Sequence, residues 1–106
     1  MAGGMIYTAG QVAWDATGEV TAVGDVRGQT IQTLANIQAV LEEGGATWDD
    51  VVKCNVYLKD MADFQIMNEE FAKVFPKDPP ARTTVQTPLA EETMLVEIEA
   101  IAYIGG

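Results

Sequence analysis

Apolar residues recur at helical spacing in two segments of the chain. They return every three or four residues between about Val26 and Glu43, and again after Asp60. The first stripe consists of Ile31, Leu34, Ile37 and Leu41, and the second consists of Phe64, Met67, Phe71 and Val74. Side chains three and four positions apart share one face of an α-helix, so the pattern predicts two amphipathic helices.

Capping residues predict where these helices begin and end. Asp25 is suited to the N-cap of the first helix, and Gly44-Gly45 is a strong stop signal at its end. Asp60 opens the second helix, with Asp63 three residues on in an arrangement like a capping box. The prolines that end this helix are Pro76, Pro79 and Pro80.

Five further segments carry the β-rich or alternating pattern of strands. They are Met5–Val12, Glu19–Val23, Asp50–Leu58, Ala81–Gln86 and Met94–Tyr103. The turn at residues 15–18 would join the first two into a hairpin. In the third strand, alternation places Val52, Cys54, Val56 and Leu58 on one face and Val51, Lys53, Asn55 and Tyr57 on the other.

The element order β-β-α-β-α-β-β predicts a single domain over residues 1–106. Two helices on one face of a mixed sheet give an α+β two-layer sandwich. The small strand residues Cys54, Ala100 and Ala102 suit the face that the helices cover.

The opposite sheet face keeps a mixture of apolar and acidic side chains. Those predicted there are Val51, Tyr57, Leu95, Glu97, Glu99 and Ile101. A large uncovered apolar patch usually marks an interface, so we interpret this face as an oligomer contact. The alternative is a sheet face that is simply half solvated.

Composition and charge exclude several functions. The chain has 106 residues, 48% of them hydrophobic, with 16 acidic and 6 basic residues and a net charge of −10. Nucleic-acid affinity depends on neutralising phosphates with Lys and Arg, so RNA or DNA binding is disfavoured. No apolar run is long enough for a membrane span. Histidine is absent, which excludes mechanisms that depend on it.

Cys54 is the one cysteine of the chain. It can form no internal disulfide, which fits a reducing compartment, so we expect a cytoplasmic protein. With one Cys and no His, a structural zinc site is not expected. A buried, inert thiol is the favoured interpretation over a nucleophile.

Two charged residues stand out as candidates for chemistry. Arg82 follows Pro80-Ala81 at a strand start, a rigid position suited to two-point capture of a carboxylate, although an ion pair with an acidic neighbour is an equal alternative. Glu97 lies in the middle of the last strand, where burial would favour proton exchange near neutrality; an interface ion pair or a solvated edge is the alternative. If the last two strands form a hairpin, Arg82, Thr84 and Gln86 can share a face with Glu97.

Several segments together resemble the YjgF/Rid family. The first helix contains Gln29-Thr-Ile-Gln-Thr-Leu-Ala-Asn36-Ile, and the middle of the chain contains Asp50-Val-Val-Lys-Cys-Asn-Val-Tyr-Leu58, followed by Lys-Asp60-Met-Ala-Asp-Phe64 and Asn68. The C-terminal part contains Pro80-Ala-Arg82-Thr-Thr-Val85 and Val96-Glu97-Ile-Glu99-Ala-Ile-Ala102. The resemblance covers about Met5 to Ala102, nearly the whole chain.

The resemblance implies a chorismate-mutase-like homotrimer with its sheets facing inward and its sites in clefts between subunits. It also implies hydrolysis of reactive enamines and imines to 2-oxo acids and ammonia, with no metal or organic cofactor. Arg82 would clamp the substrate carboxylate, Glu97 would position or activate the attacking water, and backbone groups of Gly10 and Thr84 would line the pocket.

Three departures from the family pattern accompany this resemblance. The family's Gly-Pro-Tyr-Ser-like segment, whose tyrosine closes the pocket, has no counterpart before the first strand here. Ala9 stands where the family has Ser, and Thr84 stands where it usually has Cys. These changes leave a non-catalytic binder of 2-oxo acids or other small carboxylates as the alternative. The family's historical endoribonuclease and translation-inhibitor label is a third hypothesis, disfavoured by the charge.

Overall fold

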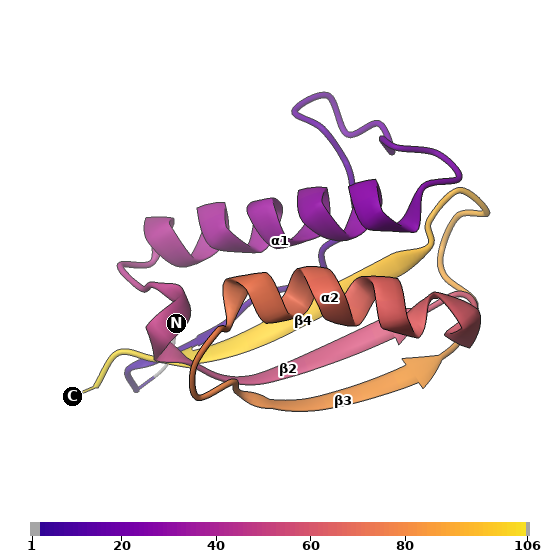
Figure 1. Cartoon of the computed structure of the whole chain (residues 1–106). Helices are drawn as coiled ribbons and strands as arrows, with labels where there is room; N and C mark the ends of the chain where they lie inside the picture. The colour runs from indigo at the N-terminus through magenta and orange to yellow at the C-terminus, as the bar shows by residue number, and fades with distance from the viewer. Residues whose placement is uncertain (1–2, 106) are drawn as a thin grey trace.

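A computed structural model describes residues 3–105 of the chain. Helices α1 (Val26–Glu43) and α2 (Phe64–Val74) lie side by side on one face of a four-stranded sheet (Figure 1). No element of the described chain covers the other sheet face, which we call the open face. The predicted α+β two-layer sandwich is therefore confirmed. Within residues 3–105, no helix combines the length and the apolar character that a membrane crossing requires.

The sheet contains β1 (Met5–Tyr7), β2 (Val51–Leu58), β3 (Ala81–Gln86) and β4 (Val96–Tyr103) in the spatial order β1-β4-β2-β3. β4 pairs antiparallel with both β1 and β2, whereas β2 and β3 are parallel and are connected through α2. Short 3-10 helices precede β2 (η1, Trp48–Asp50) and α2 (η2, Met61–Asp63). Because β2 lies between β3 and β4, the last two strands do not form the hairpin considered from the sequence.

The N-terminal hairpin predicted from the sequence is wrong in two respects. β1 ends at Tyr7, although the Gln11 N–H still donates to the Ile98 carbonyl at 2.8 Å. The segment predicted as strand Glu19–Val23 belongs to a loop that projects beside α1 and contributes one isolated bridge, Trp14↔Val20. Positive φ angles at Ala22 (49°) and Gly24 (78°) interrupt the extended backbone that a strand needs.

The predicted start and end of α1 are confirmed. The Asp25 side chain accepts a hydrogen bond from the Gly28 N–H at 3.1 Å, which makes Asp25 the N-cap. Gly44 is the C-cap, and Gly45 follows with a φ of +84°. One member of the predicted stripe, Ile31, is 51% exposed. The helix instead buries Gln29, whose side chain bonds Thr93 O at 2.7 Å and Leu95 N at 2.8 Å just before β4.

The start of the second helix differs from the prediction. Asp60 caps η2 by accepting from the Ala62 N–H at 2.9 Å, and α2 itself begins only at Phe64. Asp63 makes no capping hydrogen bond through its side chain. The expected capping box is therefore replaced by a single cap on a short 3-10 turn.

A register irregularity in β2 corrects the predicted faces of that strand. The pairing with β4 shifts between Val51 and Lys53, which adds one residue to β2. As a result Val51 is buried in the core, whereas Val52 is 48% exposed. After Lys53, the side chains of β2 alternate between the two sheet faces as predicted. Cys54, Val56 and Leu58 face the helices, together with alternate residues of β4.

The core fills the space between the sheet and the helices. Its largest fully buried apolar side chains are Ile37, Leu41, Leu58, Met67 and Ile98. The small residues Cys54, Ala100 and Ala102 are buried here as the sequence predicts, and they let the helices approach the sheet.

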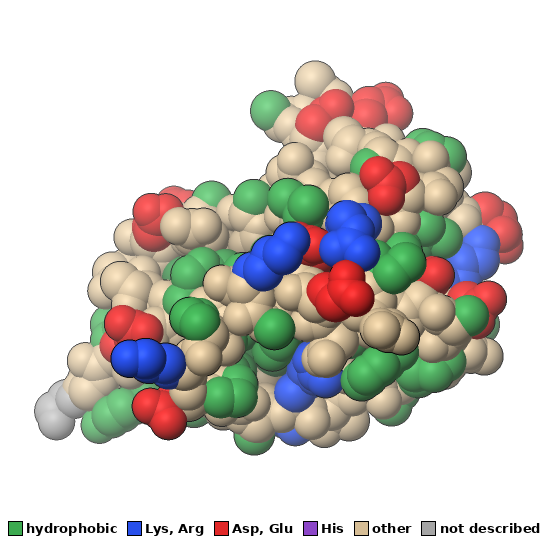
Figure 2. All heavy atoms as spheres, in the orientation of Figure 1, with side chains coloured by type: hydrophobic (Ala, Val, Ile, Leu, Met, Phe, Trp, Pro, Cys, Tyr) green, Lys and Arg blue, Asp and Glu red, His purple; other side chains and the backbone are tan. Residues whose placement is uncertain are grey.

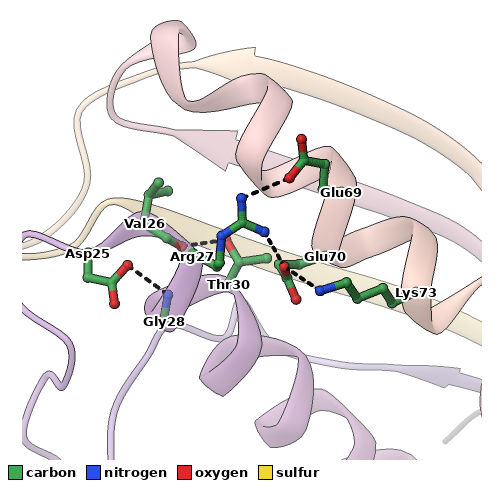
Figure 3. Close-up of polar contacts among 8 residues, drawn as sticks. All are labelled: Asp25, Val26, Arg27, Gly28, Thr30, Glu69, Glu70 and Lys73. Carbon is green, nitrogen blue, oxygen red and sulfur yellow. Dashed lines mark hydrogen bonds and ion pairs between the residues drawn. The ribbon is translucent and has the colours of Figure 1, made fainter.

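An ion-pair cluster joins the two helices on the outer side of the molecule (Figures 2 and 3). Arg27 of α1 bonds Glu70 of α2 and also bonds Glu69 at 2.8 Å, while Lys73 bonds Glu70 at 2.9 Å. Glu70 is only 4% exposed, and its two cationic partners lower the pKa of its carboxyl. The cluster therefore places a carboxylate between the helices with its negative charge compensated by two cations.

Candidate functional site

Arg82 lies near the start of the edge strand β3, on the face that the helices cover. Its partner in the parallel register is Cys54, which is buried beneath α2. The Arg82 Cζ lies 4.7 Å from the ring centroid of Phe71 and 5.4 Å from that of Phe64. Partial burial lowers the pKa of the guanidinium from its ordinary value, yet an arginine remains charged in proteins. Two aromatic side chains of α2 therefore hold a cation at the sheet edge.

None of the ion pairs among residues 3–105 includes Arg82. Arg27, Lys59 and Lys73 all have a carboxylate partner, so Arg82 differs from them. The alternative of a structural ion pair within the chain is therefore wrong. A guanidinium with free donors beside a cavity is the arrangement that captures a carboxylate.

The cavity at Arg82 has a volume of about 310 Å³. Its lining residues are Asn68, Phe71, Ala72, Phe75, Pro79, Pro80 and Arg82. The polar groups Arg82 and Asn68 combine here with apolar walls, as in small-ligand sites. A larger cavity of about 460 Å³ lies between Trp48 and Lys77, but neither Arg82 nor Glu97 lines it, so the Arg82 cavity is the candidate site.

Glu97 is the second residue of β4, nearer the strand start than the sequence predicts, and lies on the open face directly opposite Tyr57 of β2. Burial raises the pKa of its carboxyl, and the charge of Glu99 raises it further. Within the described chain, no side-chain or backbone donor bonds the Glu97 carboxylate. A carboxylate with these properties is suited to exchange protons with a ligand or a water molecule.

Gly10 lies against Glu97. A Cβ added at Gly10 would overlap the Glu97 carboxylate and would lie 2.9 Å from its Cδ. The next residues along the two segments, Gln11 and Ile98, exchange paired backbone hydrogen bonds of 2.8 and 2.9 Å, which hold Gly10 beside Glu97. A residue without a side chain is therefore needed for Glu97 to occupy its position.

Thr84 lies on β3 with Val56 as its partner, two residues after Arg82 and on the same face. Its Oγ1 is buried and has no hydrogen-bond partner among the described residues. The structure thus brings Thr84 together with Arg82, and Gly10 together with Glu97. A buried hydroxyl without a partner is an available donor or acceptor for a bound molecule.

Arg82 and Glu97 lie on opposite faces of the sheet. The register aligns Arg82, Cys54 and Ala100 on the helix-covered face, and Val85, Tyr57 and Glu97 on the open face. The shared face considered for Arg82, Thr84, Gln86 and Glu97 is therefore wrong. The cause is the register: Tyr57 of β2 is paired with both Val85 and Glu97, so Glu97 shares a face with Val85 and not with Arg82.

The structure also reveals a polar network that the sequence did not single out. Glu99 Oε1 accepts hydrogen bonds from Tyr57 OH at 2.7 Å and from Asn55 Nδ2 at 3.0 Å. Strand alternation does place all three residues on the face of Glu97, but only the register shows which of them pair. Cys54, by contrast, takes no part in the site: burial raises the pKa of its thiol to about 11, as expected for an inert cysteine.

Comparisons with known proteins show the family to which the chain belongs. The family model described as endoribonuclease L-PSP matches residues 1–104. A RutC family protein of Pyrococcus horikoshii is 48% identical over 103 residues, covering 96% of this chain and 81% of that protein. A RutC family protein of Saccharolobus solfataricus is 42% identical over 100 residues, covering 94% of this chain and 79% of that protein.

Solved structures show the same fold. RidA from an Antarctic Psychrobacter superposes with a TM-score of 0.90 at 37% identity, covering 98% of this chain and 84% of its own. Rv2704 from Mycobacterium tuberculosis, described as a member of the YjgF/YER057c/UK114 family, gives 0.87 at 30% identity, with coverages of 98% and 82%. Fold and sequence thus define a small α+β protein of the Rid type. The chain belongs to the endoribonuclease L-PSP family, the group that contains the YjgF and Rid proteins.

Proposed function

We propose that this chain hydrolyses reactive 2-imino acids and their enamine tautomers to 2-oxo acids and ammonia, at a site completed by two copies. One copy supplies Arg82 and Thr84, and the next supplies Gly10 and Glu97. The observation that carries this proposal is the placement of Arg82 and Glu97 on opposite sheet faces. One chain cannot direct both side chains to one small substrate, whereas two neighbouring copies can.

The open face supports assembly of copies. It carries exposed aromatic and aliphatic side chains, with Tyr7 61%, Tyr103 48% and Val85 41% exposed. Apolar side chains gathered on one face are typical of interaction surfaces. An interface that joins the Arg82 side of one copy to the Glu97 side of the next is head-to-tail, and such interfaces close into rings. The family resemblance gives the number of copies, so we propose a homotrimer.

The chemistry requires few groups. The Arg82 guanidinium binds the substrate carboxylate through two parallel hydrogen bonds. Water attacks the imine carbon while Glu97 accepts its proton, which forms a carbinolamine. Glu97 then returns that proton to nitrogen and takes up the hydroxyl proton of the carbinolamine as the C–N bond breaks. The 2-oxo acid and ammonia leave, and Glu97 passes the remaining proton to ammonia, which becomes ammonium. Positioning and acid–base help suffice, since such imines also hydrolyse unaided.

A non-catalytic carboxylate binder is the second candidate, and one observation favours it. The cavity at Arg82 is lined by residues of a single chain, so a 2-oxo acid could bind there without any contribution from Glu97. In that case Arg82 and Asn68 would form the whole polar part of the site.

Ammonia release from freshly generated 2-iminopropanoate separates the two candidates. An amino-acid oxidase generates the imine, and semicarbazide traps what remains of it. The proposal expects the wild-type chain to accelerate ammonia release and Arg82→Ala to abolish the acceleration. Calorimetric binding of 2-oxobutanoate without any acceleration of hydrolysis would make the protein a binder instead.

A further inference from the structure

β4 carries two carboxylates on the open face, and their surroundings differ. Glu99 Oε1 accepts hydrogen bonds from Tyr57 OH at 2.7 Å and from Asn55 Nδ2 at 3.0 Å. Glu97 accepts none within residues 3–105 and lies against Gly10, where no side chain shields it. One carboxylate is therefore fixed by two donors, and its neighbour is left free to react.

The Tyr57 hydroxyl donates to Glu99 and not to Glu97, the residue opposite it on β4. Tyr57 is paired in register with Glu97, and Asn55 is paired with Glu99. The hydroxyl nevertheless reaches diagonally to Glu99, so both donors of β2 serve the same carboxylate. Donors to a carboxylate favour its ionised form. The bond to Glu99 also raises the pKa of the Tyr57 hydroxyl, which keeps Tyr57 a donor.

Cations do not neutralise this pair within the described chain. Lys53, the cation of β2 on the same face, donates from Nζ to Thr83 Oγ1 at 2.7 Å, and no ion pair includes Glu97 or Glu99. The other titratable groups on this face are Tyr7, Tyr57 and Tyr103, which are neutral at ordinary pH. The charge of Glu99 thus acts on Glu97 without a compensating partner.

We infer that Glu99, held in place by hydrogen bonds from Asn55 and Tyr57, is a positioning residue whose negative charge keeps the neighbouring Glu97 ready to take up and return a proton. Neighbouring carboxylates whose surroundings differ in this way divide into one that stays ionised and one that exchanges protons. The raised pKa of Glu97, caused by burial and then by the charge of Glu99, agrees with this division. The inference rests on the proposed function for the catalytic use of Glu97, but the relation between the two carboxylates is independent of it.

Carbon-13 NMR of the glutamate carboxyls across a pH series tests the relation directly. The Glu97 resonance is identified by its loss in Glu97→Gln. In Glu99→Gln we expect Glu97 to titrate at lower pH than in the wild-type protein, because the neighbouring negative charge is gone. A Glu97 titration that stays unchanged in Glu99→Gln overturns the inference.

Glu42→Gln is the matched control, because it removes the same charge elsewhere. Gln29 of α1 contacts the residues just before β4, and Glu42 lies thirteen residues further along the helix, about 20 Å away at the usual rise. That distance exceeds the Debye length of about 8 Å at physiological salt, so Glu42→Gln should leave the Glu97 titration in place. An equal shift in both variants would show a net-charge effect and would overturn the inference.

Tyr57→Phe provides a test that keeps both carboxylates, should Glu99→Gln fail to fold. Glu99 then loses one of its two hydrogen bonds, so the chemical shift of its carboxyl carbon at pH 7 should change. A Glu99 carboxyl resonance that does not move in Tyr57→Phe would show that the hydroxyl does not hold this carboxylate, and the inference would fall.

A rate profile separates this inference from the proposed function. In a plot of imine hydrolysis rate against pH, the fall in rate at acidic pH (the acid limb) should move to lower pH in Glu99→Gln, together with the Glu97 titration. A wild-type protein without hydrolysis but with the expected NMR shift would refute the proposed function and leave the relation between the carboxylates standing. Hydrolysis that depends on Glu97 but falls at the same acidic pH in Glu99→Gln as in the wild-type protein would support the proposed function and refute the relation between the carboxylates.

Discussion

Gly10 and Glu97 are in such close contact that a side chain at position 10 would have to displace the Glu97 carboxylate. A Cβ at Gly10 would overlap the Glu97 carboxylate, 2.9 Å from its Cδ. The two residues are 87 positions apart in sequence, and the bridge between Gln11 and Ile98 holds them together. The glycine thus leaves the space that the Glu97 carboxylate occupies.

Gly10→Ala should therefore displace Glu97 and slow imine hydrolysis. Misplacing a catalytic group by about 1 Å can cost up to about 10²-fold in rate. Binding of 2-oxobutanoate should persist, since Arg82 is untouched and lies on the opposite sheet face. Kinetics and calorimetry on the same sample check both expectations, and a Gly10→Ala protein with full activity would remove Glu97 from the reaction.

Arg82→Lys should weaken carboxylate binding although the charge is kept. A lysine is a point donor and cannot reproduce the two parallel bonds of a guanidinium. A hydrogen bond to a charged group is worth about 1.5–3 kcal/mol, or roughly a ten- to hundredfold loss of affinity. Calorimetry with 2-oxobutanoate measures this, with Arg27→Lys as the matched control, because Arg27 is occupied by Glu69 and Glu70. Equal affinities in the two variants would refute the role of Arg82.

Glu97→Gln should separate binding from chemistry. The amide keeps the size of the side chain but cannot accept a proton from water. General acid–base groups contribute about 10²–10⁴-fold, and the fast unaided reaction favours the low end. In the wild-type protein the rate should fall as pH drops through the raised pKa of Glu97, because the protonated form is not a base. This acid limb should be absent in Glu97→Gln, and its persistence there would assign it to another group.

The same substitution should stabilise the fold at neutral pH. Burial raises the pKa of Glu97 in the folded state, so the stability that comes with protonation is fully present below the unfolded pKa of about 4.3 and is lost as pH rises through the folded value. An uncharged amide avoids that loss. Denaturant unfolding at pH 7 should show Glu97→Gln more resistant than the wild-type protein, with the difference vanishing in acid. A less stable variant at pH 7 would show that the ionised carboxylate has favourable partners.

Glu70 should show the opposite pH dependence. Hydrogen bonds from Lys73 and Arg27 lower its folded pKa, so its contribution is present above the unfolded pKa and lost as pH falls through the folded value. Glu70→Gln should cost about 1–3 kcal/mol in the free energy of unfolding at pH 7. Glu69→Gln is the matched control, because the Glu69 side chain is 48% exposed and its ion pair should contribute little. Equal losses in both variants would contradict this account of the cluster.

Local signals in the sequence predicted the helices and the two longest strands. Asp25 and Gly44-Gly45 define α1 through backbone capping, and the prolines around residue 80 define the start of β3. The Glu19–Val23 segment failed because positive φ at Ala22 and Gly24 bends the backbone, which β propensity alone does not reveal. The irregularity after Val51 depends on the pairing with β4 and has no local signal.

The residues of the candidate site could be proposed one by one from the sequence, but their arrangement in space could not. Arg82 and Glu97 stand out by residue type and strand position. Their placement on opposite faces follows from the register, because Glu97 is aligned through Tyr57 with Val85, three residues after Arg82. Sequence alternation fixes the face of a residue within one strand, whereas the relation between strands depends on their order and register.

Mixing two inactive variants tests the composite site most directly. Arg82→Ala and Glu97→Gln each lack one half of the site, and the halves lie on opposite faces of the sheet. If neighbouring copies complete each other in a ring, coexpressed variants should regain about a quarter of the wild-type hydrolysis, the fraction of interfaces at which both intact halves meet in random assembly. Light scattering of the same sample should give the mass of three chains. No recovery in a mixed trimer, or a monomer that hydrolyses the imine at the wild-type rate, would contradict the account.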